Sequence, residues 1–471
     1  MDDGHQPPEG PRIGADEWVA RQEEHHRRHE LTRRLERAGG RISPPFRFFL
    51  LVGGIAIFGI ATSDQYYQRV GFNTLYYAAI ALGLNVVVGW AGLLDLGYVA
   101  FFGLGAYAYA LLDSPKFHHH WPALATMVVV GLGCAVVGIL VSLPSRRLFG
   151  DYLAIITLFF GQIFYNLVGN LSLTNGQNGM TNLDPLDFFG FHITTVRQYF
   201  FVALVLFTVV TCVLWLINNS RTGRAWRSLR EDQMAAQLLG MPVNWLKLLA
   251  FAFGAAVAGL SGVVFASLEV NIFPNNFYLS VLITLYAIVI LGGAGSMPGV
   301  MLGTFVIIVG LELLSTPDNA RLLFYAVIAA GLALFLRPLK WIPIVVGGTI
   351  ALGFVVNTVA TSVWPSGTKP TDFGGQNHMM SSWVVELTNP TRAGAWAYAI
   401  LIGAVLGLTL LKGWVRKVAL IPVIYLAAFV WENELVLNPS VTAMILLGAL
   451  LIAVMIARPA GLLGKARVEI G

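Results

Sequence analysis

Long apolar runs are the feature of this sequence that most constrains its fold. A helix needs about 20 apolar residues to cross the ~30 Å hydrocarbon core of a bilayer. Hydrophobic residues make up 56% of the 471-residue chain and charged residues only 12%, a composition that excludes an ordinary soluble protein. The sequence therefore predicts an all-α polytopic membrane protein with about 14 apolar spans. These runs lie at 46–63, 73–91, 93–112, 122–142, 152–170, 199–217, 247–267, 279–294, 299–315, 320–336, 341–363, 394–412, 418–432 and 440–457.

The basic residues predict how the runs are oriented. If the polar tail 1–46 lies inside, alternation of the runs places both termini in the cytoplasm. Of the 30 Lys and Arg residues, 24 then lie on the inner side, as the positive-inside rule requires. The basic residues behind the net charge of +5 are therefore distributed by membrane side, and the charge is no sign of a nucleic-acid partner. The outer basic residues are Arg69, Lys116, Arg197, Arg321, Lys369 and Arg392.

One long internal segment, 218–246, is polar and helix-forming, and it separates two apolar runs. Its periodicity predicts short surface helices that end at Gly240 and Pro242. An ordinary basic cytoplasmic loop is the alternative interpretation. The residues that could contact a soluble partner are Arg221, Arg224, Arg227 and Arg230, which recur every third residue, followed by Glu231, Ala235, Ala236 and Gly240.

This segment resembles the coupling loop with which ABC importer permeases dock onto their ATPase subunits. Strings elsewhere are similar, in order and spacing, to branched-chain amino-acid permeases of the LivM/LivH type. They are GLNVVVGWAGLLDLGYVAFFGLGAYAYALL at 83–112, DYLAIITL at 151–158, LGGAGSMPGVMLG at 291–303 and ARPAGLLG at 457–464.

The resemblance implies the all-helical fold of an ABC importer permease in a bacterial inner membrane. It also implies two ATP-binding subunits, a second permease subunit and an extracytoplasmic substrate-binding protein, which would dock near the loop 171–198 with its string LTNGQNGM. The implied substrate is a branched-chain or related amino acid; urea and short amides stay open.

The domain organisation departs from that family near the C-terminus. We expect a tail at 1–46, a permease core at 47–338 that includes the coupling loop, additional spans at 339–457 and a tail at 458–471. The string LFLRPLK at 334–340 already resembles the family's closing helix, and a second Arg-Pro follows at 458–459. The additional spans are therefore expected at the periphery of the bundle.

Several kinds of chemistry are absent from the sequence. It contains no G-x-x-x-x-G-K-[ST], H-E-x-x-H or G-x-S-x-G string, so we expect no ATP site, no catalytic site, no metal site and no cofactor. The clusters His25, His26 and His29, and 118–120, lack the further ligands of a metal site. A stand-alone secondary carrier or channel is the alternative function, with Asp95 and Glu312 as its main ionisable candidates.

Asn85, Asp95 and Tyr98 are the candidate residues of a substrate path. Asp95 lies between Gly92 and Gly97, where irregular backbone would be tolerated if it lined a water-filled cavity. Its carboxylate could pair with a substrate ammonium group, and Tyr98 could donate a hydrogen bond on the same face. The alternative is that Asp95 caps a helix beginning near Leu96 and that Tyr98 packs against lipid or a neighbouring span.

Small residues predict close helix packing. Gly295, Gly299 and Gly303 form two overlapping G-x-x-x-G steps, which we expect on one helix face. Pro298 suits the first turn of a helix, so the apolar run is expected to break within 292–297.

Overall fold

The computed structural model describes residues 44–113, 121–146, 151–188, 190–315, 317–335, 341–368, 383–385, 387, 391–411, 413–435 and 439–464. The predictions for the tail 1–43, for both histidine clusters and for the first Arg-Pro at 337–338 lie outside these residues. So do the last seven residues and most of the segment 364–393.

The chain divides into two compact units, 1–63 and 64–471. In the first unit, α3 (Pro44–Ala61) is an apolar helix with several exposed large side chains, including Phe49 and Ile57. The second unit begins with Asp64, which caps α4 by accepting a hydrogen bond from the Tyr66 amide.

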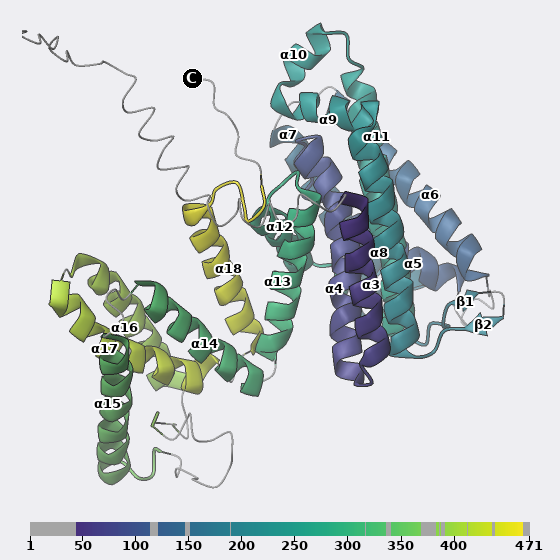
Figure 1. Cartoon of the computed structure of the whole chain (residues 1–471). Coiled ribbons are helices and arrows are strands. Elements are labelled where there is room, and N and C mark those ends of the chain that lie inside the picture. Colours follow the sequence, from purple (N-terminus) through teal and green to yellow (C-terminus); the bar gives the residue numbers. More distant parts are fainter. Residues whose placement is uncertain are drawn as a thin grey trace, which may run out of the picture. The chain divides into compact units, whose positions relative to one another are not determined.

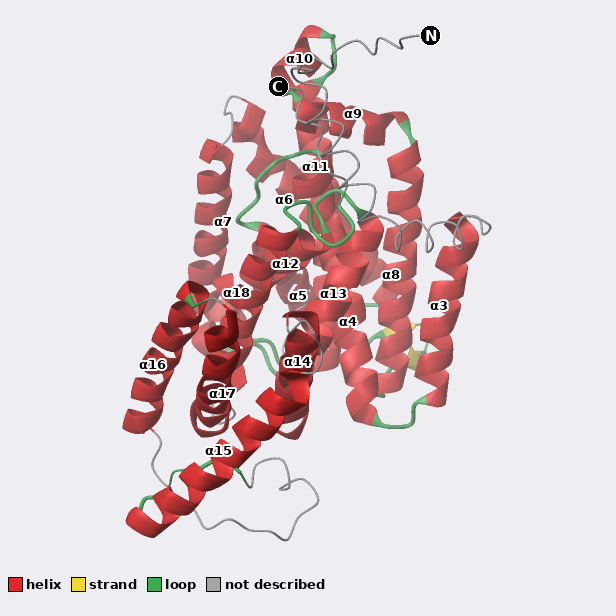
Figure 2. Ribbon diagram, turned by 60° about the vertical axis from the view of Figure 1, so that its left-hand side comes forward, coloured by secondary structure: helices red, strands yellow, loops and turns green. Residues whose placement is uncertain are grey.

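Helices, red in Figure 2, make up most of the described part of the second unit, and the two short strands described there form one antiparallel hairpin. The elements up to the polar segment are α4 (Gln65–Leu84), π-helix η1 (Asn85–Trp90), α5 (Tyr98–Leu112), α6 (Ala123–Ser142), η3 (Leu143–Arg146), α7 (Asp151–Asn170), η4 (Ser172–Thr174), η5 (Gly176–Asn178), β1 (Asp187–Phe188), β2 (Phe191–His192) and α8 (Val196–Asn219). The remaining elements are α9 (Arg221–Glu231), α10 (Gln233–Leu238), α11 (Val243–Glu269), η6 (Pro274–Phe277), α12 (Leu279–Gly292), α13 (Met297–Ser315), α14 (Pro317–Phe335), α15 (Trp341–Val363), α16 (Thr391–Leu410), α17 (Gly413–Val430), π-helix η7 (Trp431–Leu435) and α18 (Pro439–Ala457).

Each predicted apolar run contains one of these helices, which confirms an all-helical polytopic membrane protein. Within the described residues, nine helices are long and apolar enough to cross a membrane, and shorter apolar helices accompany them. The apolar run 93–112 starts before its helix, since α5 begins only at Tyr98, and the irregular backbone expected around Asp95 is confirmed, because residues 91–97 form no helix. The predicted break near 292–297 is confirmed, since α12 ends at Gly292 and Pro298 lies in the first turn of α13.

Helix α11 forms the centre of the packing. It lies against α5, α6 and α4, and α4 packs in turn against α8 (Figure 1). Glycine permits these close approaches: a Cβ added at Gly105 would overlap the Gly259 carbonyl, and one at Gly262 would overlap the Phe102 carbonyl. The α5–α11 contact is therefore a backbone-to-backbone contact of the kind that small residues allow.

The C-terminal helices do not behave as one peripheral block. Helices α15, α16 and α17 pack among themselves, but α18 packs against α12 and α13. The amides of Leu462 and Leu463 donate to the Leu291 and Gly292 carbonyls at 2.8 and 3.1 Å. Helix α18 is thus attached to α12 and α13, and the position of the segment 341–456 at the periphery of the bundle stays a prediction.

Candidate functional site

The polar segment folds as two short helices at one end of α8 and α11 (Figure 1). Ser220 caps α9 by accepting from the Gly223 amide at 3.3 Å. Asp232 separates the helices and caps α10, accepting from the amides of Met234 and Ala235 at 2.8 and 3.0 Å. The predicted surface helices are thus present. The interruption at Asp232 was not predicted, although an aspartate followed by helix-forming residues is an ordinary start signal.

Three of the four arginines lie on the exposed side of α9. Arg224 donates through Nη1 to the Asn219 carbonyl at 3.0 Å, and Arg227 donates through Nη2 to the Asn218 carbonyl at 2.8 Å. Both bonds are local and fasten α9 to the last turn of α8. Arg221 is exposed at the start of the helix.

Arg230 points the opposite way, into the membrane part of the chain. Its Nη1 donates to the Gly89 carbonyl in η1 and to the Ala294 carbonyl, at 3.2 Å, in the loop between α12 and α13. Trp226 is buried one turn earlier, where its indole Nε1 donates to the Leu246 carbonyl at 2.9 Å. Its ring lies 6.3 Å from that of Trp90. The inner face of α9 is therefore bonded to three other elements.

The small residues of this segment are not all exposed. Ala235 and Gly240 are exposed, as is Glu231, and Gly240 has a φ of 78° that ends α10 in the left-handed region. Ala236 is only 2% exposed and packs within this chain. The expectation that Ala236 contacts an ATPase subunit conflicts with this burial, because a buried methyl group is not accessible to a partner.

Large apolar side chains cover the tip of the segment instead. Leu238 and Leu239 are 89% and 78% exposed, and Met234 is also largely exposed. Three such residues on one short helix and its C-terminal cap form an exposed apolar patch, a feature that often marks a protein-binding surface. The sequence analysis did not identify this patch, because its candidate residues in α10 were Ala235 and Ala236, the small residues between Met234 and Leu238.

Asn85 lies at the start of π-helix η1, a geometry that is common at functional sites. Its Oδ1 accepts from the Gly295 amide at 2.7 Å. Its Nδ2 is buried and has no hydrogen-bond partner among the described residues. Trp90, at the end of η1, donates from Nε1 to the Gly295 carbonyl at 3.1 Å. Both ends of η1 are therefore attached to the same residue of the α12–α13 loop.

Asp95 is completely buried in the irregular stretch between η1 and α5. Its Oδ1 accepts from the Gly97 amide at 3.0 Å, so the side chain stabilises the turn before α5 rather than the first turn itself. The Tyr286 hydroxyl donates to the Asp95 carbonyl at 2.7 Å and accepts from its amide at 3.1 Å. The second carboxyl oxygen, Oδ2, has no hydrogen-bond partner among the described residues.

Tyr98 does not share the surroundings of Asp95. Its hydroxyl lies 3.1 Å from the Ile80 carbonyl of α4 and 3.0 Å from the Gly254 carbonyl of α11, and the side chain is fully buried. The hydroxyl therefore links two neighbouring helices, which matches the packing alternative more closely than a role in a water-filled path.

The three glycines of the 295–303 string serve two different purposes. Gly299 and Gly303 lie on α13, where an added Cβ would overlap the carbonyls of Gly292 and Ile288 in α12. Gly295 precedes the helix with a φ of 91°, a conformation that favours glycine. The expectation that all three share one helix face therefore fails for Gly295, because α13 begins two residues later.

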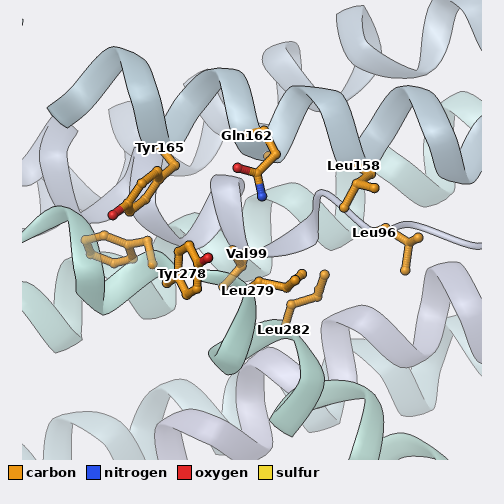
Figure 3. A pocket seen from close by; sticks show the side chains of 10 residues that line it. Leu96, Val99, Leu158, Gln162, Tyr165, Tyr278, Leu279 and Leu282 are labelled. Carbon is orange, nitrogen blue, oxygen red and sulfur yellow. The ribbon is translucent and has the colours of Figure 1, made fainter. Parts of the chain in front are cut away.

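A narrow pocket lies between α7 and α12, and Figure 3 shows Gln162 and Tyr165 of α7 opposite Tyr278 and Leu282. The space that a water-sized sphere can occupy there is about 10 Å³, room for about one water molecule. Leu96, next to Asp95, also lines it. In this conformation the pocket does not hold an amino acid.

Comparison with known proteins adds a family match. A model described as "Branched-chain amino acid transport system / permease component" matches residues 68–330. That range contains η1, the α9–α10 segment and the α12–α13 loop, and it ends within α14. No solved structure matches the chain.

Individual relatives match over a similar part of the chain. The high-affinity branched-chain amino acid transport system permease protein LivM of Escherichia coli K12 is 37% identical over 265 residues, which cover 51% of this chain and 62% of that protein. The probable LivM protein of Methanocaldococcus jannaschii is 26% identical over 271 residues, 49% of this chain and 75% of its own. LivH of Salmonella typhimurium is 26% identical over 248 residues, which cover 49% of this chain and 79% of that protein.

Proposed function

Because this chain belongs to the family of permease components of branched-chain amino acid transport systems, we propose that it moves branched-chain or related amino acids across the bacterial inner membrane. The observation that carries the proposal is the family match over residues 68–330, which includes both the membrane core and the polar α9–α10 segment. The chain is therefore proposed to act as a transporter subunit rather than an enzyme.

Separate subunits would supply the energy and capture the substrate. We propose two ATP-binding subunits, a second permease subunit and an extracytoplasmic substrate-binding protein as partners. The apolar patch of Met234, Leu238 and Leu239 supports the ATPase contact, since its exposed area is suited to a protein cleft. The exposed Arg221, Arg224 and Arg227 would form the rim of that contact, where charges steer association.

The proposed orientation has both termini in the cytoplasm and about 14 spans. The excess of Lys and Arg on the inner side supports it. With α9 and α10 inside, the β1–β2 hairpin lies at the opposite end of α8, on the side where a substrate-binding protein would dock (Figure 1).

Reconstitution in proteoliposomes tests the proposal. With the ATPase, permease and binding-protein partners and internal ATP, we expect uptake of labelled leucine, with little uptake when ATP or the ATPase subunits are omitted. The double variant Leu238→Asp/Leu239→Asp should lose most ATP-dependent uptake, because charged side chains oppose burial in an apolar interface. Val363→Asp, at the exposed C-terminal end of α15 and outside the family-matched range, is the matched control and should retain uptake. Equal leucine uptake without the ATPase subunits would instead support a stand-alone carrier.

Asp95 is the residue that we propose to contact the substrate ammonium group. It is a buried carboxyl with an oxygen, Oδ2, that no described group satisfies, and buried polar atoms without partners require an explanation. In Asp95→Asn the Oδ1 acceptor for the Gly97 amide remains, so the turn should survive. Loss of one charge-assisted hydrogen bond should lower leucine uptake about 10- to 100-fold at unchanged protein level. Glu312→Gln is the control; normal uptake by Asp95→Asn would make Asp95 purely structural.

A further inference from the structure

Arg230 joins the polar segment to two membrane helices at their C-terminal ends. The Gly89 carbonyl lies in the last turn of the continuous α4–η1 helix, and the Ala294 carbonyl follows the end of α12. Helix C-termini present carbonyls without intrahelical partners and carry partial negative charge, so a cation is stabilised there. A single guanidinium with several donors in a fixed fork is suited to bridging two such ends.

Two glycines, Gly295 and Gly92, make room for this side chain. A Cβ at Gly295 would lie 2.5 Å from Arg230 Nη1, and a Cβ at Gly92 would lie 2.9 Å from Arg230 Cγ. Gly92 and Gly295 also have positive φ values of 69° and 91°. At Gly89, whose carbonyl Arg230 binds, a Cβ would collide with Asn85 and the Gly295 amide. The backbone around Arg230 is thus shaped to admit the guanidinium.

The two helix ends that Arg230 contacts are also fastened to each other. Asn85 and Trp90 bind the amide and the carbonyl of Gly295, which ties η1 to the α12–α13 loop. The string after α18 adds a further connection, because the amides of Leu462 and Leu463 bind the last carbonyls of α12. A displacement of Arg230 would therefore act on α4, α12 and α18 together.

We propose that Arg230 is the positioning residue that transmits movement of α9, driven by the ATPase subunits, to the C-terminal ends of α4–η1 and α12. This inference rests on the proposed function, since it assumes that an ATPase binds α9 and α10. The other three arginines do not have this role: Arg224 and Arg227 bind carbonyls within the α8–α9 turn, and Arg221 is exposed at the start of α9. Arg230 thus differs from them in connecting α9 to distant membrane helices.

The test measures ATP hydrolysis and leucine uptake in the same reconstituted complex. Arg230→Gln removes the charge and the fork, so the uptake per ATP hydrolysed should fall at least about tenfold, as expected for losing a charge-assisted hydrogen bond. Hydrolysis stimulated by the binding protein should stay within about twofold of the unsubstituted complex, because the exposed docking patch is unchanged. Arg230→Lys retains the positive charge and should recover part of the coupling.

Arg416→Gln is the matched control, since it removes the same charge from an exposed side chain of α17, outside the family-matched range 68–330; its uptake per ATP should stay within about twofold. If Arg230→Gln lowers hydrolysis and uptake in proportion, or if Arg416→Gln uncouples as strongly, the assignment is overturned. If Arg230→Gln does not accumulate as folded protein, Arg230→Lys provides the test. Unchanged uptake per ATP in Arg230→Lys would show that a guanidinium that bridges the two carbonyls is not required. Absence of ATP-dependent uptake in the unsubstituted complex would instead refute the proposed function.

Discussion

Replacing Arg321 with alanine should destabilise the packing of α14 against η7 by about 3–5 kcal/mol, the cost of leaving one partner of a buried ion pair alone. Arg321 Nε lies 2.7 Å from Oε2 of Glu432, whose side chain is 0% exposed. The Tyr325 hydroxyl donates to the other oxygen at 3.4 Å. Removing the guanidinium would take away the cationic partner of this buried carboxylate, and the neutral Tyr325 hydroxyl at 3.4 Å is a weaker donor.

The expected result is a large drop in the midpoint of thermal unfolding of the purified protein. Trp431 stacks on Phe324 with ring centroids 4.3 Å apart, so tryptophan fluorescence should report the loss of this contact. The double variant Arg321→Met/Glu432→Met is the control, because replacing both partners with apolar residues removes the uncompensated charge and often restores stability. A double variant as unstable as Arg321→Ala would show that the charges are not the cause.

This ion pair also bears on the extra C-terminal segment. Arg321 lies inside the family-matched range 68–330, whereas Glu432 lies beyond it. Asn433, the next residue, donates to the Val385 carbonyl and accepts from the Leu387 amide, both at 2.8 Å, so it binds two residues that also lie beyond the matched range. The helices beyond the matched range are thus attached to α14 by the Glu432 contacts and by apolar packing.

Composition and periodicity were sufficient to predict the helices, since every apolar run contains one and the polar segment forms surface helices. The direction of Arg230 is harder to predict. Four residues spaced by three rotate by about 60° per step on an α-helix, so Arg221 and Arg230 lie on opposite sides of α9. That rotation can be read from the sequence, and Trp226 and Leu229 mark the buried side. The identity of the carbonyls on that side depends on tertiary packing.

Other features could not be obtained from local pattern. The π-helix at 85–90 lies in the same apolar run, 73–91, as the end of α4, and its side chains Asn85 and Trp90 bind Gly295, some 200 residues away. The burial of Ala236 and the exposure of Leu238 and Leu239 likewise depend on which side of α10 meets α9 and α11. The position of α18 against α12 could not be predicted, because the sequence contains two Arg-Pro strings, at 337–338 and 458–459. Sequence alone does not say which of the two follows the helix that packs against α12.

Substituting Gly105 with alanine should give the second large effect, a loss of about 1–3 kcal/mol or more, because an extra methyl group in a closely packed contact forces the backbone apart. The added Cβ would overlap the Gly259 carbonyl and Cα, which belong to the central helix α11 and have no rotamer to change. Alanine favours helix more than glycine does, so the expected destabilisation opposes the intrinsic propensity.

A graded series of glycine substitutions separates the steric cause from propensity. At Gly131 an added Cβ would meet only the flexible Leu260 side chain, at 3.3–3.4 Å, so Gly131→Ala should cost less than Gly105→Ala. At exposed Gly133 nothing lies within 4 Å, and Gly133→Ala should leave the unfolding midpoint unchanged or slightly raised. Thermal unfolding of the three variants, together with leucine uptake, provides the measurement. Because α11 holds α4, α5 and α6 together, Gly105→Ala should lower both readouts; equal midpoints across the series would contradict the close backbone contact.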